Sequence, residues 1–314
     1  MPLEPRLRPI VALYGAMGRG GTDVSYADQR VQAEAMAKRG RWLVMPRGPK
    51  MASERDLTVP VDGGQIRVRL YQPDAAGPLP LHVFLHGGGW CVGSLYERDP
   101  RCREIAAGAR ATVASVEYRL APENAYPVPA EDCYAALTWL VGHADELRID
   151  PSRIGIGGES AGANLAAAVC LMARDRGGPA IAHQWLDVPA VDARLQTESM
   201  TDVPDGNLLD LATIHAFRDA YFQDPGRMLE PYGSPLLADS HEGLAPAWIM
   251  SAEFDKLRDD GRAYAHALEA AGVPVEFRLL RGHVHPSFAF TRLLPSAKAY
   301  EREAIAALGR ALHP

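Results

Sequence analysis

Ser160 lies in the pentapeptide at residues 158–162, which has the form G-x-S-x-G. An apolar run precedes it, and an alanine-rich helical pattern extends from residue 161 to about 174. A serine on such a tight strand-to-helix turn is held in strained backbone angles, with its hydroxyl exposed at the helix N-terminus. Glycine-rich turns before helices also occur for packing reasons. Ser160 is therefore a candidate nucleophile, which needs a base and donors for an oxyanion.

Three consecutive glycines follow His86 at the end of another apolar run. Acyl transfer to a serine creates a tetrahedral oxyanion, which is stabilised by backbone N–H groups aimed at it. Consecutive glycines leave their amides unshielded by side chains. We expect Gly88 and Gly89, together with the amide of Ala161, to form an oxyanion hole. We expect His86 itself to anchor the loop by hydrogen bonding and not to act as a base.

The remaining members of a catalytic triad should follow Ser160 in the order acid, then histidine. Asp255 follows one late apolar run, and both His283 and His285 follow the last one. An aspartate in this place would orient the imidazole and stabilise the imidazolium that forms when the serine loses its proton. Asp259 and Asp260 fit better as the start of the next helix. The residue pattern by itself leaves two histidines as candidates for the base.

The elements that must position these residues are short β-rich runs that alternate with helical patterns, which is typical of a mostly parallel sheet covered by helices. The first two runs flank a turn and should pair antiparallel, and the others form the parallel core. The eight expected strands are 57–61, 66–71, 81–85, 112–118, 154–157, 184–188, 247–251 and 275–280.

Residues 1–50 and 193–232 depart from this alternation and are largely helical in pattern. We expect them to form a cap, as an N-terminal part and an inserted segment, over a catalytic domain made of residues 51–192 and 233–314. Open α/β sheets bind ligands at the carboxyl ends of their strands, so Trp90 and Phe217 are candidates for shaping a substrate pocket there. The inserted segment is rich in charged residues, which argues against the large apolar lid of a long-chain lipase.

Composition excludes several classes of function. The 33 basic and 39 acidic residues give a net charge of −6, so the chain has no excess of positive charge that would attract the phosphates of a nucleic acid. The four cysteines are widely scattered, so free, buried thiols are expected and neither a metal site nor a redox motif. No uncharged stretch is long enough to span a membrane, and the N-terminal apolar run predicts an amphipathic helix and not a signal peptide. We therefore expect a cytoplasmic protein.

The chain resembles the hormone-sensitive-lipase family of bacterial esterases. The resemblance extends over about residues 80–290 and rests on the segments 86–90, 118–123, 150–153, 158–162 and 255–261. It implies an α/β-hydrolase fold with a helical cap, hydrolysis of carboxylic esters, and no cofactor. The family has a glycine three positions before its histidine, and Gly282 thus makes His285 the base. The family and the open edge of the sheet also suggest a homodimer formed through the last strand.

Three features depart from the family pattern. Glu159 replaces an aspartate, Ala163 replaces a third glycine, and Pro286 begins the sequence Pro-Ser-Phe after His285 where His-Gly-Phe is usual.

The expected activity is that of a carboxylesterase, which hydrolyses short- to medium-chain acyl esters through an acyl-enzyme. The same triad would also serve an amidase, a lactonase or a carbonate hydrolase, because the motif specifies acyl transfer and not the leaving group. A ligand-binding protein without catalysis would require a missing triad member, and none is missing.

Overall fold

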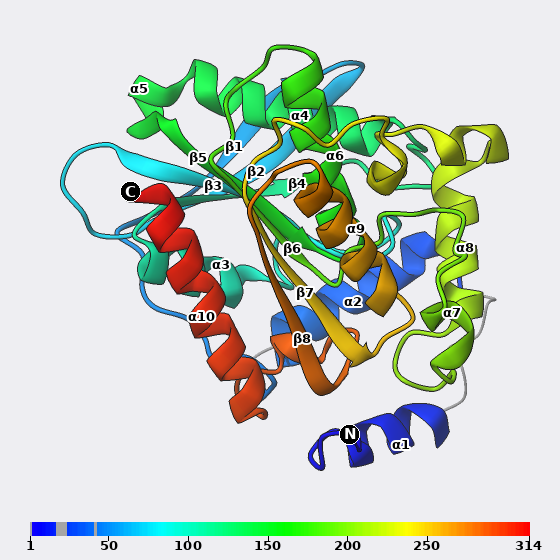
Figure 1. The fold of residues 1–314 in the computed structure, drawn as a ribbon. Coiled ribbons are helices and arrows are strands. Elements are labelled where there is room, and N and C mark those ends of the chain that lie inside the picture. Colours follow the sequence, from blue (N-terminus) through cyan, green and yellow to red (C-terminus); the bar gives the residue numbers. More distant parts are fainter. Residues whose placement is uncertain (1, 17–23, 41–42) are drawn as a thin grey trace.

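The computed structural model describes residues 2–16, 24–40 and 43–314. Within them, eight strands form a sheet with the order β1-β2-β4-β3-β5-β6-β7-β8 (Figure 1). The strands are β1 (Ser53–Val61), β2 (Gly64–Gln72), β3 (Leu79–Leu85), β4 (Thr112–Glu117), β5 (Ile149–Glu159), β6 (His183–Asp187), β7 (Ala247–Phe254) and β8 (Val275–Val284). This confirms the predicted eight-stranded sheet.

Strands β1 and β2 form an antiparallel hairpin, and β2 also pairs antiparallel with β4. The remaining neighbours pair in parallel. The carboxyl ends of β3, β5, β7 and β8 therefore meet at one edge of the sheet. The glycine run, Ser160, Asp255 and His285 follow these four strands in that order, so the topology gathers the residues that the motifs had singled out.

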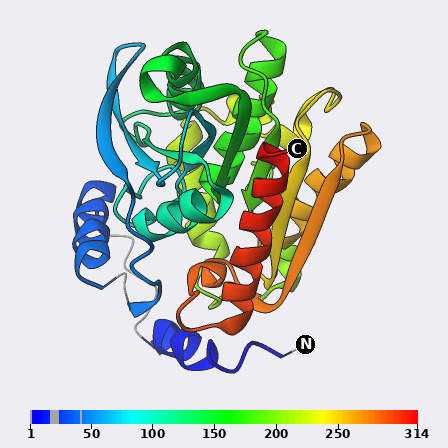
Figure 2. The ribbon, with the colours of Figure 1, turned by 90° about the vertical axis from the view of Figure 1, so that its left-hand side faces the viewer.

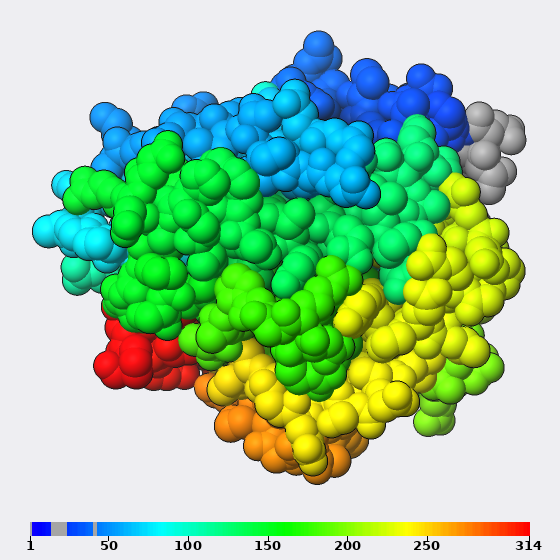
Figure 3. Space-filling model, turned by 90° about the horizontal axis from the view of Figure 1, so that it is seen from above, coloured from blue at the N-terminus to red at the C-terminus, as the bar shows by residue number. Residues whose placement is uncertain are grey.

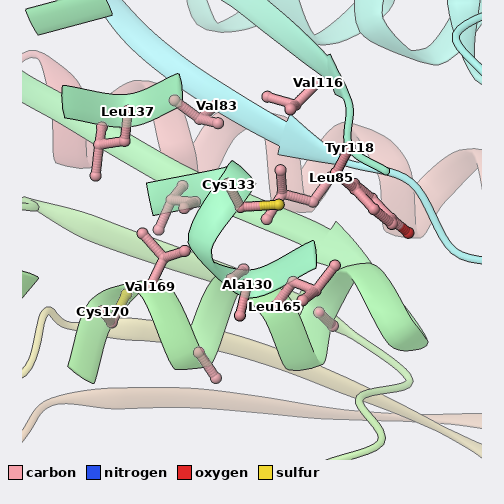
Figure 4. Packing of buried hydrophobic residues seen from close by; sticks show 14 of the residues in the cluster. Val83, Leu85, Val116, Tyr118, Ala130, Cys133, Leu137, Leu165, Val169 and Cys170 are labelled. Atoms are coloured by element: carbon pink, nitrogen blue, oxygen red, sulfur yellow. The ribbon is translucent and has the colours of Figure 1, made fainter. Parts of the chain in front are cut away.

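Helices cover both faces of the sheet (Figures 1 and 2). Helices α3 (Asp99–Ala109) and α10 (Pro295–Leu312) pack on one face, and α4 (Val128–Gly142), α6 (Ala161–Asp175) and α9 (Arg258–Ala270) pack on the other. Strand β3 is buried along its whole length, and its side chains alternate between two apolar cores: Val83 contributes to the core under α4 and α6 (Figure 4), and Phe84 to the core under α3 and α10. Burial on both faces explains why the central strands are continuous apolar runs.

Most of the strands extend beyond their predicted ends, and β5 and β8 are two examples. Strand β5 begins at Ile149 instead of 154, and its pairing with β3 shifts register between Pro80 and Leu81. The sequence around Pro151 is typical of a turn, and it concealed this irregular first part of the strand. Strand β8 continues to Val284, so that it ends immediately before His285.

The remaining elements lie before β1, between α4 and β5, between β6 and β7, and between β8 and α10. They are α1 (Arg8–Ala16), α2 (Tyr26–Gly40), α5 (Ala144–Leu147), α7 (Ser199–Asp202), α8 (Leu211–Phe222), and the 3₁₀ turns η2 (Pro225–Leu229), η3 (Pro235–Leu237) and η4 (Ser287–Ala289). Seen from above, the β1–β2 hairpin and α2 (blue) lie along one side of the molecule, and the segment after α8 (yellow) covers another (Figure 3).

Helices α2 and α8 meet although they are far apart in the sequence. The ring of Tyr26 stacks on that of Phe217 at 5.8 Å between centroids, and the Tyr26 hydroxyl donates to the carbonyl of Ala216 at 3.2 Å. Arg30 of α2 donates to the carbonyl oxygens of Cys91 and Ala121, each at 2.6 Å. These bonds attach α2 to the loop that follows the glycine run.

Candidate active site

Ser160 occupies the turn between β5 and α6, with φ 55° and ψ −120°. Its N–H donates to the carbonyl of Asp187 at 2.8 Å, which ties the turn to the end of β6. A Cβ atom at Gly158 would lie 2.4 Å from the carbonyl oxygen of Leu85, and one at Gly162 would lie 2.1 Å from the same atom. The two glycines of the motif are therefore required because the elbow presses against the end of β3.

The glycine run turns sharply beside this elbow. Gly88 has φ 119° and Gly89 has φ 58°, a region that side chains rarely adopt. The carbonyl of Gly88 accepts the amides of Cys91 at 3.1 Å and Val92 at 3.0 Å, which fixes the loop. Gly88, Gly89 and Ala161 line the same pocket as Ser160. The structure thus brings together the residues predicted to form an oxyanion hole.

His285 and Asp255 lie within hydrogen-bond distance at the ends of β8 and β7. His285 Nδ1 donates to Asp255 Oδ2 at 2.7 Å, and Asp255 Oδ1 accepts the amide of Leu257 at 3.0 Å. Asp255 is buried, while His285 lines the pocket beside Ser160. A carboxylate bound to Nδ1 leaves Nε2 as the nitrogen that can accept a proton.

His283 is engaged elsewhere. Its Nδ1 lies 2.9 Å from the hydroxyl of Ser287 and its Nε2 lies 2.9 Å from that of Ser296. Burial lowers the pKa of this imidazole, which favours its neutral form. Both ring nitrogens are occupied by structural hydrogen bonds, so the geometry favours His285 over His283 as the base.

His86 is an anchor within the glycine loop. Its ring stacks on Tyr118 at 4.4 Å between centroids, and its Nδ1 donates to the carbonyl of Gly87 at 2.8 Å. The Tyr118 hydroxyl donates to the carbonyl of His86 at 2.8 Å. Burial lowers the pKa of His86. These contacts agree with the structural role expected from the sequence.

The pocket above Ser160 is a hollow of about 680 Å³, counting the space at its mouth. Apolar side chains from the segment between β6 and β7 form much of its wall, together with Trp90. They are Leu195, Leu209, Ile214 and Phe217. Two charged residues, Asp192 and Arg218, also reach it, and each has a close partner: Asp192 accepts from Arg194, and Arg218 donates to Asp219.

Asn164 is a functional candidate that the sequence analysis missed. It lies one helical turn after Ser160 and is fully buried. Its Oδ1 accepts from Trp90 Nε1 at 3.3 Å, and its Nδ2 donates to the carbonyls of Ala190 at 2.8 Å and Gly233 at 2.9 Å. A single amide thus fixes three walls of the pocket. A lone polar residue in an alanine-rich helix was the signal that could have identified it.

A second hollow reaches Ser160 and His285 from the side of Pro286 and Phe288. Polar groups line it, including His86, Glu97 and Glu159. Burial raises the pKa of Glu97. Ser160 lines both hollows, so a reacting carbon at the serine can be approached from either one.

Groups of side chains suited to hold a metal ion are absent from residues 2–16, 24–40 and 43–314. In the same part of the chain, no helix has the length and apolar character needed to cross a membrane. All four cysteines are free and buried, as expected.

Comparison with known proteins identifies the family. A family model described as alpha/beta hydrolase fold matches residues 82–289. The chain is 41% identical over 313 residues to the carboxylic ester hydrolase LipN of Mycobacterium tuberculosis, covering 98% of this chain and 82% of the relative. The chain belongs to this family of α/β hydrolases. The carboxylesterase NlhH of the same organism is 44% identical over 266 residues, covering 82% of each chain.

Solved structures agree with this family. A hyperthermophilic esterase from the archaeon Pyrobaculum calidifontis superposes with a TM-score of 0.92 and is 36% identical, with 99% of each chain covered. The α/β-hydrolase fold and the resemblance to hormone-sensitive-lipase esterases predicted from the sequence are confirmed. The predicted enzyme class, a serine hydrolase of carboxylic esters, is confirmed with them.

Proposed function

We propose that this α/β hydrolase cleaves short- to medium-chain carboxylic esters through an acyl-enzyme on Ser160. The observation that carries the proposal is the 2.7 Å contact between His285 Nδ1 and Asp255 Oδ2, in a pair that faces the same pocket as the strained serine. A base oriented in this way is what a serine hydroxyl needs to become a nucleophile.

In the first half of the reaction, Ser160 Oγ attacks the ester carbonyl while His285 Nε2 takes its proton. Asp255 holds the imidazole and stabilises the positive charge that develops on it. The amides of Gly88, Gly89 and Ala161 would donate to the oxyanion. The tetrahedral intermediate then collapses, the bond to the alkoxy oxygen breaks, and the imidazolium returns its proton to the departing alcohol.

In the second half, water attacks the acyl carbon and His285 takes a proton from it. The new tetrahedral intermediate releases the carboxylic acid as Ser160 Oγ recovers the proton from the imidazolium. The acyl chain would occupy the apolar hollow, and the second hollow, whose wall also carries polar groups, would receive the alcohol or the water. Each proton leaves and returns through His285, so no cofactor is required.

The lining of the apolar hollow supports an acyl substrate. Its wall is largely apolar with a few polar groups, as is usual for small-molecule sites. We propose that residues 1–50 and 193–232 act as the cap over this hollow. The contact of Tyr26 with Phe217 supports this division, because it joins the two segments at a residue of the pocket wall.

We further infer a cytoplasmic homodimer formed through β8. In the described sheet β8 is the terminal strand, with β7 on one side, and an unpaired edge is suited to pairing with a second copy. Light scattering during gel filtration measures the molecular mass in solution, and we expect the mass of a dimer. A monomeric mass at micromolar concentration would contradict it.

The function is tested with p-nitrophenyl esters of increasing acyl length. The rate should peak at short or medium chains and vanish in Ser160→Ala, whose thermal midpoint should stay near that of the wild type. The matched pair His285→Ala and His283→Ala tests the base, because each removes one imidazole, His283 at the end of β8 and His285 directly after it. Loss of turnover is expected in the first alone. No turnover of any ester by the wild type would favour an amide, lactone or carbonate substrate.

A further inference from the structure

Arg101 of α3 lies behind the nucleophile turn, with only 2% of its side chain exposed. Its guanidinium donates to carboxylates from three different elements. Nη1 reaches Glu159 Oε2 at 3.2 Å, Nε and Nη2 reach the two oxygens of Glu301 at 3.0 and 3.1 Å, and Nη2 also donates to Asp187 Oδ2. The ends of β5 and β6 and helix α10 thus meet at one side chain.

Two of these carboxylates belong to residues that hold Ser160. Glu159 directly precedes the serine, and the backbone carbonyl of Asp187 accepts the serine N–H at 2.8 Å. Glu159 also packs closely against the oxyanion loop, since a Cβ atom at Gly87 would lie 2.9 Å from its carbonyl oxygen and 3.2 Å from its Cγ. The nucleophile turn and the oxyanion loop are therefore both adjacent to this glutamate.

Arg101 also contacts the loop that carries the base. Its guanidinium lies 5.0 Å from the ring centroid of Phe288, three residues after His285, and 5.0 Å from that of Trp185. A planar guanidinium donates through a rigid fork and stacks flat on rings, whereas an ammonium has neither the fork nor a planar face. The residue type therefore matters at this position, beyond its charge.

The carboxylate of Glu159 is held in its ionised form. Burial opposes charge on this group, but the neighbouring Arg98 and Arg101 outweigh it and keep the pKa of Glu159 below its usual value. Arg98 Nε donates to Glu159 Oε1, so both oxygens are engaged by arginines. A charged hydrogen bond of this kind is stronger and more directional than a neutral one.

We propose that Arg101 is a positioning residue, which holds the Ser160 turn, the oxyanion loop and the His285 loop in the mutual arrangement that acyl transfer requires. The proposal rests on the proposed role of Ser160 and extends it to a side chain outside both hollows at the serine. Displacement of a reacting group by about 1 Å lowers rates by about 100-fold, so a small shift of the turn would be visible in kcat.

The test compares Arg101→Lys and Glu159→Gln with Asp132→Asn. The first variant keeps the positive charge without the planar fork, and the second keeps the shape of the side chain without its charge. Asp132 is the matched control: it is a fully buried carboxylate of α4 that binds Arg119 through both oxygens, and it lines neither hollow. Each variant is assayed for kcat and KM on a p-nitrophenyl ester below its unfolding midpoint.

A second readout is the rate at which paraoxon labels the serine. Ser160 Oγ displaces p-nitrophenolate from phosphorus while His285 takes the hydroxyl proton, so the rate reports the nucleophile without an acyl substrate. Both site variants should lose about 10- to 100-fold in kcat and in labelling rate, with KM within about twofold of the wild type. Asp132→Asn should lower the unfolding midpoint and leave both rates unchanged.

The proposal is overturned if both site variants keep the wild-type kcat and labelling rate, or if Asp132→Asn loses as much of either as they do. A wild-type protein that is labelled at Ser160 but hydrolyses no ester would contradict the ester function alone, and the labelling rates would still decide the role of Arg101. Absence of labelling in the wild type would overturn both proposals.

Discussion

Gly89→Ala offers a sharp test of the oxyanion loop. The added Cβ atom would lie 2.2 Å from Phe217 Cγ and 2.3 Å from its Cδ2. Ordinary contacts between carbon atoms begin near about 3.5 Å, so the ring or the loop must move by roughly 1 Å. Phe217 is stacked on Tyr26 at 5.8 Å between centroids, which restricts movement of the ring toward α2.

The expected loss follows from this displacement. A shift of about 1 Å in a catalytic group costs about 100-fold, and loss of one oxyanion donor costs about 100- to 1,000-fold. A further cost of about 1 kcal/mol in stability comes from placing alanine at φ 58°. We expect kcat to fall by about 100-fold, with the protein still folded.

Phe217→Ala provides the control that separates crowding from backbone strain. The variant removes the ring that the new methyl group would meet, so Gly89→Ala should cost far less in its presence. The assay is a double-mutant cycle on kcat with p-nitrophenyl butyrate, together with thermal unfolding of all four proteins. A Gly89→Ala enzyme with nearly wild-type kcat would refute the assignment of this loop to the oxyanion. A loss that is unchanged without the ring would refute crowding by Phe217 as its cause and assign it to backbone strain at φ 58°.

Two other replacements test buried polar groups. Asn164→Leu should lower the free energy of unfolding by about 3 kcal/mol, about 1 for each of the three hydrogen bonds to Trp90, Ala190 and Gly233; chemical denaturation measures it, and an unchanged midpoint would refute the role. Burial raises the pKa of Asp260 to about 8, whereas an unfolded aspartate titrates near about 4. The folded chain keeps a proton that the unfolded chain releases, so this group's contribution to stability is lost as the pH rises from about 4 to about 8. Asp260→Asn should therefore lose less stability than the wild type between pH 5 and pH 8, as measured by urea denaturation; parallel curves would contradict it.

The sequence predicted those features that depend on local pattern. The glycines at 158 and 162 predicted the tight strand-to-helix turn at Ser160. The apolar runs that alternate with helical patterns predicted the mostly parallel sheet. Helix α6 follows Ser160 as the pattern predicted, and it ends at Asp175.

Features that depend on distant partners were not predictable in this way. Arg101 binds Glu301 across a separation of 200 residues, and Asn164 reaches Gly233 across 69. Nothing in the sequence around Arg101 distinguishes it from the other arginines as the one that binds these carboxylates. The choice between His283 and His285 likewise needed the family resemblance, and the hydroxyls of Ser287 and Ser296 supply its physical reason.

The meeting of α2 with α8 has a consequence for biosynthesis. Tyr26 and Ala216 are separated by 190 residues, and ribosomes add about 5 to 20 residues per second. Helix α2 therefore waits about 10 to 40 s before its partner is made, since 190 divided by 20 and by 5 gives roughly these times. During that interval the Tyr26 ring lacks its later neighbour, Phe217. The Tyr26 ring is therefore open to chaperones for this interval, and a fusion partner placed ahead of it would be present throughout.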